Sequence, residues 1–304
     1  MTRNLLEVDD LDPVTLARIL DRAEQWKATP DAVEPALAGK TVAALFQKPS
    51  ARTRLSVEVA VTTLAGHAVY VRDEEVGIDR RETAEDVART FASMCDVIAA
   101  RVFDHTLLAR FADAVDIPIV NLLSDVAHPC QALADLLTLR ETVGPLEGLR
   151  LAYLGDGNNV AASLAFAAAL SGIEFVIGTP SEYELDADVV ERARNLGGVV
   201  ELAGDPYEAV RDADAVYTDM WTSMGQEDEA DARRRAFAGW TIDGPLLKAA
   251  RDDAVFMHCL PAHRGEEVAR EVIDGPQSVV WQQAGNRMHA VRSLFVELTT
   301  GTVS

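Results

Sequence analysis

Residues 41–64, TVAALFQKPSARTRLSVEVAVTTL, decide the fold class and supply the first candidate site. The apolar run Thr41–Phe46 predicts a buried strand, and the spacing of apolar residues in Arg52–Leu64 predicts a helix. Between them, Pro49 and Ser50 are typical of a helix start, which leaves the backbone N–H groups of the first turn free. A buried strand followed closely by a helix is the repeating unit of a parallel α/β sheet.

The same alternation continues along the chain, which has 304 residues and is long enough for two domains. Further short apolar runs predict strands at Ala68–Val71, Val97–Val102, Ile117–Leu122, Arg150–Leu154, Glu174–Ile177, Val199–Leu202, Ala215–Thr218, Ala254–Met257 and Val279–Trp281. Segments with helical spacing lie between them at Thr83–Met94, Thr106–Val115, Pro129–Thr142, Asn159–Leu170 and Val189–Asn195. We therefore predict an α/β protein with two doubly wound parallel-sheet domains and the active site in the cleft between them.

The domain boundary is predicted at Val143-Gly144-Pro145, because this triplet stops a helix and a fresh strand follows. Residues 1–142 then form the first domain and residues 143–288 the second. Residues 289–304 are expected to form a helix that packs back on the N-terminal domain. The acidic segment Gln226–Asp231 is expected to be a solvated loop.

The charge of the chain excludes some classes of function. Lysine and arginine total 28 against 49 aspartates and glutamates, so the formal net charge is −21. Such an acidic surface argues against unaided binding to nucleic acid or anionic membranes. Lysine occurs only at positions 27, 40, 48 and 248. Abundant acid with scarce lysine favours a protein adapted to concentrated salt, the alternative being an ordinary acidic cytosolic protein.

Cysteine usage and the N-terminus predict a cytoplasmic protein. Cys95, Cys130 and Cys259 are too few and too scattered for a disulfide framework or a paired-cysteine zinc site. The first residues, MTRNLLEVDDLD, lack the apolar core of a signal peptide. The longest apolar stretch, residues 160–170, is too short to span a bilayer.

Polar residues follow the predicted strands of the first half, where ligands of α/β sheets bind. Ser50–Arg54 (SARTR) combines two hydroxyls, two arginines and free helix amides, a combination typical of a phosphate site. The alternative is a plain helix cap with solvated arginines. Arg101 ends another strand. His128 and Gln131 lie one helical turn apart and together suit an amide-like group.

The second half carries further polar strand ends. Gly155–Asn159 (GDGNN) resembles a dinucleotide loop, but Val160 replaces the third glycine, so the asparagines are better read as donors and acceptors for a small polar ligand. Asp219–Gly225 (DMWTSMG) offers a carboxylate for an ammonium group, or else packs its Trp and Met side chains in the core. His258-Cys259 forms a polar strand end, and Arg287 adds a cation.

Together and in this order, these motifs resemble those of the carbamoyltransferases, in particular the ornithine-specific branch of that family. Ser50–Arg54 is similar to the family's Ser-Thr-Arg-Thr-Arg loop, and His128–Gln131 (HPCQ) to its carbamoyl-holding motif. Asp219–Gly225 resembles the Asp-x-Trp-x-Ser-Met-Gly segment of ornithine enzymes, and His258–Pro261 (HCLP) their second loop.

The resemblance implies transfer of the carbamoyl group from carbamoyl phosphate to the δ-amine of L-ornithine, without cofactor or metal, in a homotrimer or an assembly of trimers. It makes domain 1–142 the carbamoyl phosphate-binding domain and 143–288 the ornithine-binding domain. Carbamoyl phosphate would be bound by Ser50, Ala51, Arg52, Thr53, Arg101, His128, Gln131, Cys259, Leu260 and Arg287. Of these, the implied catalytic residues are Arg101, His128, Cys259 and Arg287. Ornithine would be bound by Asn159, Asp219, Ser223 and Met224.

Three positions depart from the family pattern. Ala51 replaces a threonine, Gly77 lies in a loop that lacks the usual glutamine, and Gly285 stands where glutamate is common. Three other functions stay open from the residues: a nicotinamide dehydrogenase, a carbamoyltransferase for putrescine or an acylated ornithine, and a non-catalytic regulatory paralogue.

Overall fold

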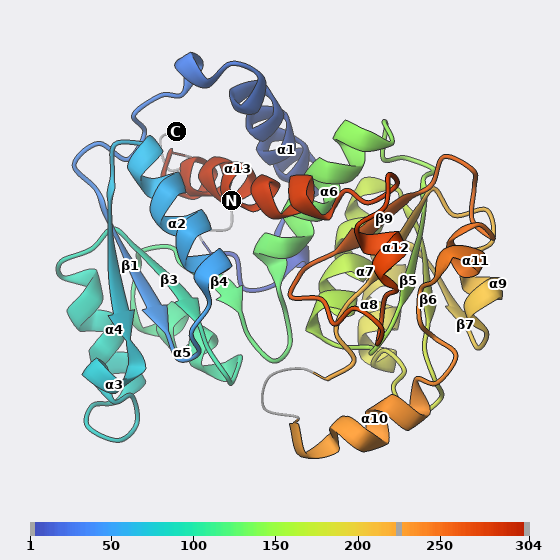
Figure 1. The fold of residues 1–304 in the computed structure, drawn as a ribbon. Coiled ribbons are helices and arrows are strands. Elements are labelled where there is room, and N and C mark those ends of the chain that lie inside the picture. The colour runs from blue at the N-terminus through green and yellow to red at the C-terminus, as the bar shows by residue number, and fades with distance from the viewer. Residues whose placement is uncertain (1–3, 223–226, 301–304) are drawn as a thin grey trace. The chain divides into compact units, whose positions relative to one another are not determined.

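The computed structural model describes residues 4–222 and 227–300, and the chain divides into two compact units (Figure 1). The N-terminal unit comprises Met1–Leu137 with Gly285–Ser304, and the C-terminal unit comprises Thr138–Ala284. Within the described ranges, every helix is too short or too polar to serve as a membrane span.

The N-terminal unit is built on a four-stranded sheet of order β2-β1-β3-β4, in which all neighbours are parallel. Its strands are β1 (Thr41–Phe46), β2 (His67–Arg72), β3 (Val97–Arg101) and β4 (Ile119–Leu123). Its helices are α1 (Pro13–Ala28), α2 (Ala51–Thr63), α3 (Asp73–Val76), α4 (Ala84–Ala92), α5 (Thr106–Ala114) and the first part of α6 (Pro129–Thr142).

The last helix, α13 (Val280–Thr300), belongs to the N-terminal unit from Gly285 onward. There it pairs with α1, because Arg18 and Arg22 of α1 both bond to the Glu297 carboxylate. Lys27 of α1 also donates to the Asn286 side chain at 2.7 Å. Residues up to 279 positions apart in sequence are thereby joined in one unit.

The C-terminal unit has a five-stranded parallel sheet of order β7-β6-β5-β8-β9. Its strands are β5 (Arg150–Leu154), β6 (Glu174–Gly178), β7 (Val199–Ala203), β8 (Ala215–Thr218) and β9 (Val255–His258). Its helices are α7 (Asn159–Ser171), α8 (Ala187–Asn195), α9 (Pro206–Val210), α10 (Ala230–Ala236), α11 (Gly244–Leu247) and α12 (Arg270–Ile273).

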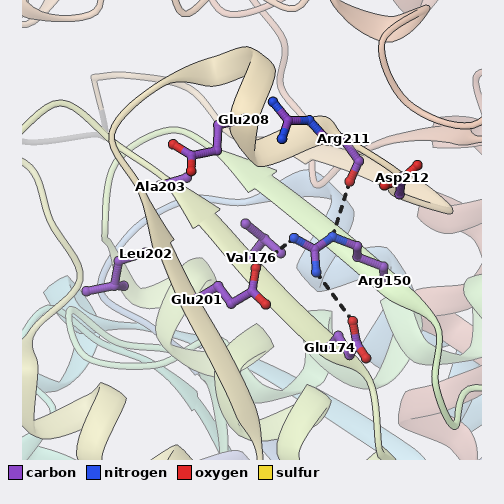
Figure 2. A pocket seen from close by; sticks show the side chains of 9 residues that line it. All are labelled: Arg150, Glu174, Val176, Glu201, Leu202, Ala203, Glu208, Arg211 and Asp212. Atoms are coloured by element: carbon purple, nitrogen blue, oxygen red, sulfur yellow. Dashed lines mark hydrogen bonds and ion pairs between the residues drawn. The ribbon is translucent and has the colours of Figure 1, made fainter.

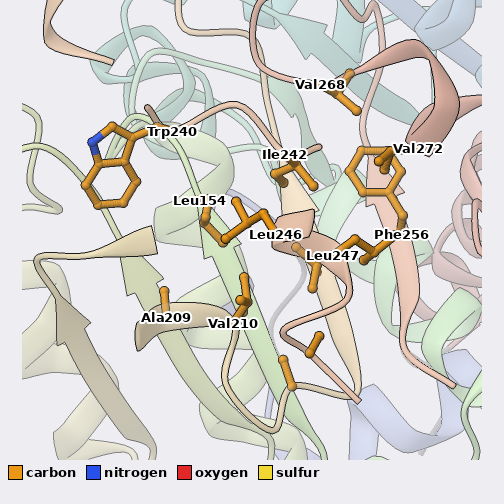
Figure 3. Packing of buried hydrophobic residues seen from close by; sticks show 14 of the residues in the cluster. Leu154, Ala209, Val210, Trp240, Ile242, Leu246, Leu247, Phe256, Val268 and Val272 are labelled. Carbon is orange, nitrogen blue, oxygen red and sulfur yellow. The ribbon is translucent and has the colours of Figure 1, made fainter. Parts of the chain in front are cut away.

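Both faces of this second sheet are covered. Ala152 and Leu154 of β5 join a buried apolar cluster with α9, α11 and α12, part of which is drawn in Figure 3. Tyr153 lies between them in sequence, so it points to the opposite face, where it packs against Phe175 and Tyr217. Burial of consecutive residues on both faces is the pattern of a parallel sheet sandwiched by helices. The prediction of two doubly wound parallel α/β domains is confirmed.

Two predicted elements are wrong. Val279–Trp281 is not a strand: residue 279 makes one backbone bond to Phe256 of β9, and α13 then begins at Val280. Asn286 and Arg287 therefore lie within a helix and do not follow a strand.

The acidic segment Gln226–Asp231 is also not a simple loop. Gln226 lies outside the described residues, but a 3-10 turn spans Glu227–Glu229 and α10 begins at Ala230. Two ion pairs between residues one turn apart stabilise α10, although the acidic composition of this segment predicts a loop. Arg233 pairs with Glu229, and Arg234 pairs with Asp231.

Candidate active site

Each sheet brings polar residues together where its strand order reverses. In the N-terminal unit the chain leaves β1 toward β2 on one side and returns to β3 on the other, and Phe46 is paired with Arg101. In the C-terminal unit β5 and β8 flank the corresponding point, where Leu154 is paired with Thr218. Such switch points open a crevice at the carboxyl ends of parallel strands. Both candidate clusters lie at these ends.

The N-terminus of α2 has the expected cap. Ser50 has extended backbone, and its hydroxyl oxygen accepts from the Thr53 N–H while its own proton is donated to Thr53 Oγ1 at 2.9 Å. Ala51 is the first helical residue and is exposed. The free N–H groups of this turn and the helix dipole favour an anion.

Thr53 and Gln131 are joined by Arg287, although they lie far apart in sequence. One amino group of the Arg287 guanidinium donates to Thr53 Oγ1 at 3.1 Å, and the other donates to Gln131 Oε1 at 2.9 Å. The three residues are buried, with Arg287 only 4% exposed. Thr53 Oγ1 thus accepts from both Arg287 and Ser50, so its own proton remains available to a ligand.

Asp135 fixes the amide of Gln131. Its carboxylate accepts from Gln131 Nε2 at 2.8 Å, one turn further along α6, and the residue is fully buried. The amide oxygen of Gln131 is therefore the atom turned toward Arg287. Asp135 is not among the site residues predicted from the sequence, although its spacing of four from Gln131 on a predicted helix indicates that the two side chains can meet.

His128 is a neutral imidazole. Burial lowers its pKa well below the ordinary value, and the charges of Arg287 and Arg101 lower it further. A neutral ring acts as a hydrogen-bond donor or acceptor and cannot serve as a proton-donating imidazolium near neutral pH. Arg101 at the end of β3 is also buried, at 6% exposure. The two arginines therefore give the surroundings of His128 a positive charge.

The two arginines of residues 50–54 differ in what they contact. Arg54 bonds to the Glu58 carboxylate at 2.7 Å and stacks over the ring of Tyr70, so it is committed to the surface of its own helix. Arg52 is exposed and makes no ion pair with any residue that the structure describes. Of these two arginines, Arg52 is therefore the one whose guanidinium can bind an anion.

The cluster of the C-terminal unit is centred on Asp219, which follows β8. Its Oδ1 accepts from the Met220 N–H at 2.8 Å and from the Cys259 thiol at 2.9 Å, and its Oδ2 accepts from Asn158 Nδ2 at 3.1 Å. The carboxylate is 6% exposed. All three donors are neutral, so they hold the carboxylate in place without compensating its charge. Such a group suits a ligand ammonium.

The loop Gly155–Asn159 serves packing and capping. Asn158 Oδ1 accepts from the N–H groups of Val160 and Ala161 as the cap of α7. A Cβ on Gly157 would lie 2.4 Å from the Leu185 nitrogen, so glycine is needed there because another segment crosses the loop. A packing reason of this kind removes the argument for a dinucleotide site. Asn159 is the first residue of α7.

His258 ends β9, and its side chain is fully buried. Its Nδ1 accepts from the Leu260 N–H at 2.8 Å, and its Nε2 lies 3.2 Å from Glu267 Oε1. Glu267 is likewise fully buried and is not among the site residues predicted from the sequence. No local pattern signals it, because it lies in an irregular segment nine residues downstream.

Two groups of described residues have the geometry to meet a metal ion. They are Asp219, His258 and Cys259, and His263, Glu266 and Glu267. In the first group the donor atoms already bond to one another or to the backbone, as described above. In the second, Glu266 pairs with Arg234, and Glu267 Oε1 accepts from the His263 N–H. We assign no metal to either group.

A hollow of about 470 Å³ lies on the C-terminal unit, away from the strand ends just described (Figure 2). Arg150, at the start of β5, crosses it and bonds to the carboxylates of Glu174 and Glu201 and to the Arg211 carbonyl. These contacts raise the pKa of Arg150 and lower that of Glu201. The positive charge of Arg150 at the centre of this hollow is therefore already neutralised by neighbouring carboxylates.

The structure links some of the predicted site residues within each unit. Ser50, Thr53, Gln131 and Arg287 are linked by hydrogen bonds in one unit, and Asp219 and Cys259 in the other. Ser223 and Met224 lie outside the described residues. Trp221, from the same motif, is buried and stacks on Phe237, as the core alternative predicts.

These two α/β units, one with a cationic anion-binding cluster and one with a buried carboxylate, define an enzyme that takes two small polar substrates. The chain belongs to the aspartate/ornithine carbamoyltransferase family. The family's carbamoyl-P binding domain matches residues 3–141, and its Asp/Orn binding domain matches residues 147–298. The chain is accordingly a transferase.

Individual relatives agree with the family. An ornithine carbamoyltransferase of Acidothermus cellulolyticus is 48% identical, over 97% of this chain and 96% of the relative. The solved ornithine carbamoyltransferase of Pyrococcus furiosus is 45% identical with a TM-score of 0.94, covering 99% of this chain and 98% of that one. A solved N-acetyl-L-ornithine transcarbamylase is 26% identical with a TM-score of 0.86, covering 96% and 98%.

Proposed function

We propose that the chain transfers the carbamoyl group of carbamoyl phosphate to the δ-amine of L-ornithine, giving L-citrulline and phosphate. The observation that carries the proposal is the buried fork of Arg287, which holds Thr53 and Gln131 on either side of one guanidinium. Ornithine is favoured over an acylated ornithine, because the two ornithine carbamoyltransferases compared above are 48% and 45% identical to this chain and the N-acetyl-L-ornithine transcarbamylase is 26% identical.

Each of the two clusters would bind one of the two substrates. Residues 1–142, with the returning helix 289–304, would bind carbamoyl phosphate, and residues 143–288 would bind ornithine. Ser50, Ala51, Arg52, Thr53 and Arg101 would hold the phosphate oxygens through hydroxyl, amide and guanidinium donors. Asn159, Asp219, Ser223 and Met224 would hold the amino-acid end of ornithine, with the Asp219 carboxylate on its ammonium group.

The chemistry needs orientation and positive charge. The neutral δ-amine adds to the carbamoyl carbon, the bond from that carbon to the phosphate oxygen breaks, and the amine proton leaves with the phosphate. Arg101, Arg287 and neutral His128 would stabilise charge on the carbonyl oxygen by donating hydrogen bonds. Gln131 Oε1, fixed by Asp135, would accept from the carbamoyl amine, while Cys259 and the Leu260 carbonyl line the reaction centre.

A citrulline assay with carbamoyl phosphate and ornithine tests the proposal directly. We expect saturable citrulline formation, with putrescine and N-acetylornithine used at least about 100-fold less well, because putrescine lacks the α-carboxylate of ornithine and N-acetylornithine lacks the α-ammonium group that Asp219 would bind. No turnover with any amine would instead indicate a regulatory paralogue, and faster use of putrescine would overturn the ornithine assignment.

Replacing Ala51 by threonine is expected to tighten carbamoyl phosphate binding. The exposed first position of α2 would regain a hydroxyl donor, worth about 1–3 kcal/mol at most to a charged group. Titration of carbamoyl phosphate measures the change. Ala51→Val is the matched control, because valine has the shape of threonine without the hydroxyl. Unchanged or weaker binding by the threonine variant would show that the site is already complete.

We also propose a homotrimer, open to further assembly. Leu55 and Val59 of α2 and Val69 of the edge strand β2 expose apolar side chains, at 61%, 43% and 38%. Exposed apolar side chains gathered on neighbouring elements are typical of a contact with another chain. All three cysteines are free thiols, which supports a place in the reducing cytoplasm.

The enzyme is expected to need salt for its stability and assembly. A net charge of −21 makes the subunits repel at low ionic strength, where at ~0.01 M the screening length is about 30 Å. At ~1 M it falls to about 3 Å, so distant carboxylates hardly interact. Added KCl should therefore raise the melting temperature and keep subunits together. Sedimentation and activity after hours at ~0.05 M and ~2 M KCl measure this, and identical results would contradict salt adaptation.

A further inference from the structure

Leu260 has a backbone conformation that its side chain disfavours. Its φ of +59° is in the left-handed region, where a branched residue is uncommon and the conformation costs of order 1–3 kcal/mol. Such a conformation persists only where the surroundings impose it. The Leu260 N–H donates to His258 Nδ1 at 2.8 Å, which is the contact that holds the turned backbone.

This contact fixes the tautomer of His258. Because Nδ1 accepts a hydrogen bond it carries no proton, so in the neutral ring the proton is on Nε2. Nε2 then donates to Glu267 Oε1, at 3.2 Å. Both side chains are fully buried. Glu267 Oε1 also accepts from the His263 N–H, so the carboxylate is itself anchored to the segment that follows the turn.

We propose that Glu267 and His258 are positioning residues, which hold the Leu260 backbone in its left-handed turn and so aim its carbonyl, next to Cys259, at the reacting carbamoyl group. The proposal rests on the function proposed above, because it takes Cys259 and Leu260 to line the reaction centre. Neither side chain needs to touch a substrate. A carboxylate that orients an imidazole, which orients a third group, is the arrangement by which active sites fix geometry.

Two substitutions, each of which mimics one nitrogen of the His258 ring, test whether His258 positions the Leu260 backbone or only fills space. In His258→Asn the side-chain oxygen takes about the place of Nδ1 and can accept from the Leu260 N–H. In His258→Gln the terminal amide reaches about as far as Nε2 and keeps only the contact with Glu267. We expect His258→Gln to lower kcat about 100-fold and His258→Asn to retain at least about ten times more activity. The KM for carbamoyl phosphate should change less than about threefold in both.

The matched controls alter Glu267, which contacts His258, and His263, which contacts Glu267. Glu267→Gln keeps an acceptor for the His258 N–H and should retain most activity, whereas Glu267→Ala should behave like His258→Gln. His263→Asn alters a half-exposed side chain whose Nδ1 lies 3.8 Å from Glu267 Oε2, and it keeps the backbone N–H that donates to Glu267 Oε1, so kcat should stay within about twofold. Thermal unfolding of every variant identifies any loss that follows from stability alone.

Crystal structures of the two His258 variants provide a readout that does not depend on turnover. We expect Leu260 to stay left-handed in His258→Asn and to relax in His258→Gln. Equal kcat values with an unchanged Leu260 backbone in both variants would overturn the positioning role. If the wild-type enzyme forms no citrulline, the proposed function fails. In that case the Leu260 conformation in the two variants still tests whether His258 holds the Leu260 backbone in its left-handed turn.

Discussion

Substituting lysine for Arg287 is expected to lower kcat/KM by about 100-fold or more. The planar guanidinium donates to Thr53 and Gln131 from two separate nitrogens, at 3.1 and 2.9 Å. A lysine ammonium is a point donor on a flexible chain and cannot span both acceptors in this fixed geometry. Removing one such preorganised donor typically costs about 10²–10³ in rate. Steady-state kinetics over both substrates measures the loss.

Arg292→Lys is the matched control for this experiment. Arg292 lies on the same helix and is as buried as Arg287, but among the described residues its guanidinium interacts with Trp26 and His289, which are not part of the proposed site. Its replacement should lower stability and leave kcat/KM within about threefold. Equal losses in the two variants would mean that Arg287 matters through the packing of α13, and the catalytic assignment would fall.

The strand β1 and helix α2 were predictable because their signals are local. A buried run, a Pro-Ser helix start and a helical apolar stripe each depend on neighbouring residues, and the structure has β1 at Thr41–Phe46 and α2 at Ala51–Thr63. The wrong strand Val279–Trp281 shows the limit of such signals. Its β-branched residues fit a strand, but only one residue there pairs with β9 before α13 begins. Tertiary packing overrode the local preference.

The clustering of site residues depends on strand order, which the sequence does not determine. Arg101 is paired with Phe46, the last residue before the loop that leads to α2, because β3 is the neighbour of β1, and Asp219 meets Cys259 because β8 is the neighbour of β9. The family resemblance predicts all of them as site residues, whereas their positions along the chain alone do not bring any two of them together.

Supporting residues were the hardest to foresee. Glu267 reaches His258 from an irregular segment, and its role depends on burial that no periodicity reports. The sequence predicts the Asn158 side chain as a donor or acceptor for a small polar ligand, whereas in the structure it caps α7 and donates to Asp219. A polar side chain can cap a helix, bond to another side chain or bind a ligand, and the sequence alone does not distinguish these roles.

The change Asp219→Asn is expected to raise the KM for ornithine about 100-fold and leave that for carbamoyl phosphate within about threefold. Asp219 is held by the Met220 N–H, the Cys259 thiol and the Asn158 amide, none of which carries positive charge. Its negative charge is therefore available to the ammonium group of a substrate, and a charge-assisted bond in a buried site is worth about 1.5–3 kcal/mol. A neutral amide gives up that charge and also presents N–H groups to neighbours that donate. Initial rates with each substrate varied in turn separate the two KM values.

The other end of the same strand offers the control, because Asp214 precedes β8 as Asp219 follows it. Asp214 accepts from the Arg150 N–H at 2.8 Å and pairs with Arg251, at the amino end of the sheet, away from the site. Asp214→Asn should lower the melting temperature without altering either KM beyond about twofold. If Asp219→Asn raised both KM values equally, or if Asp214→Asn reproduced its effect on ornithine, Asp219 would be a residue of the fold and the ammonium would bind elsewhere.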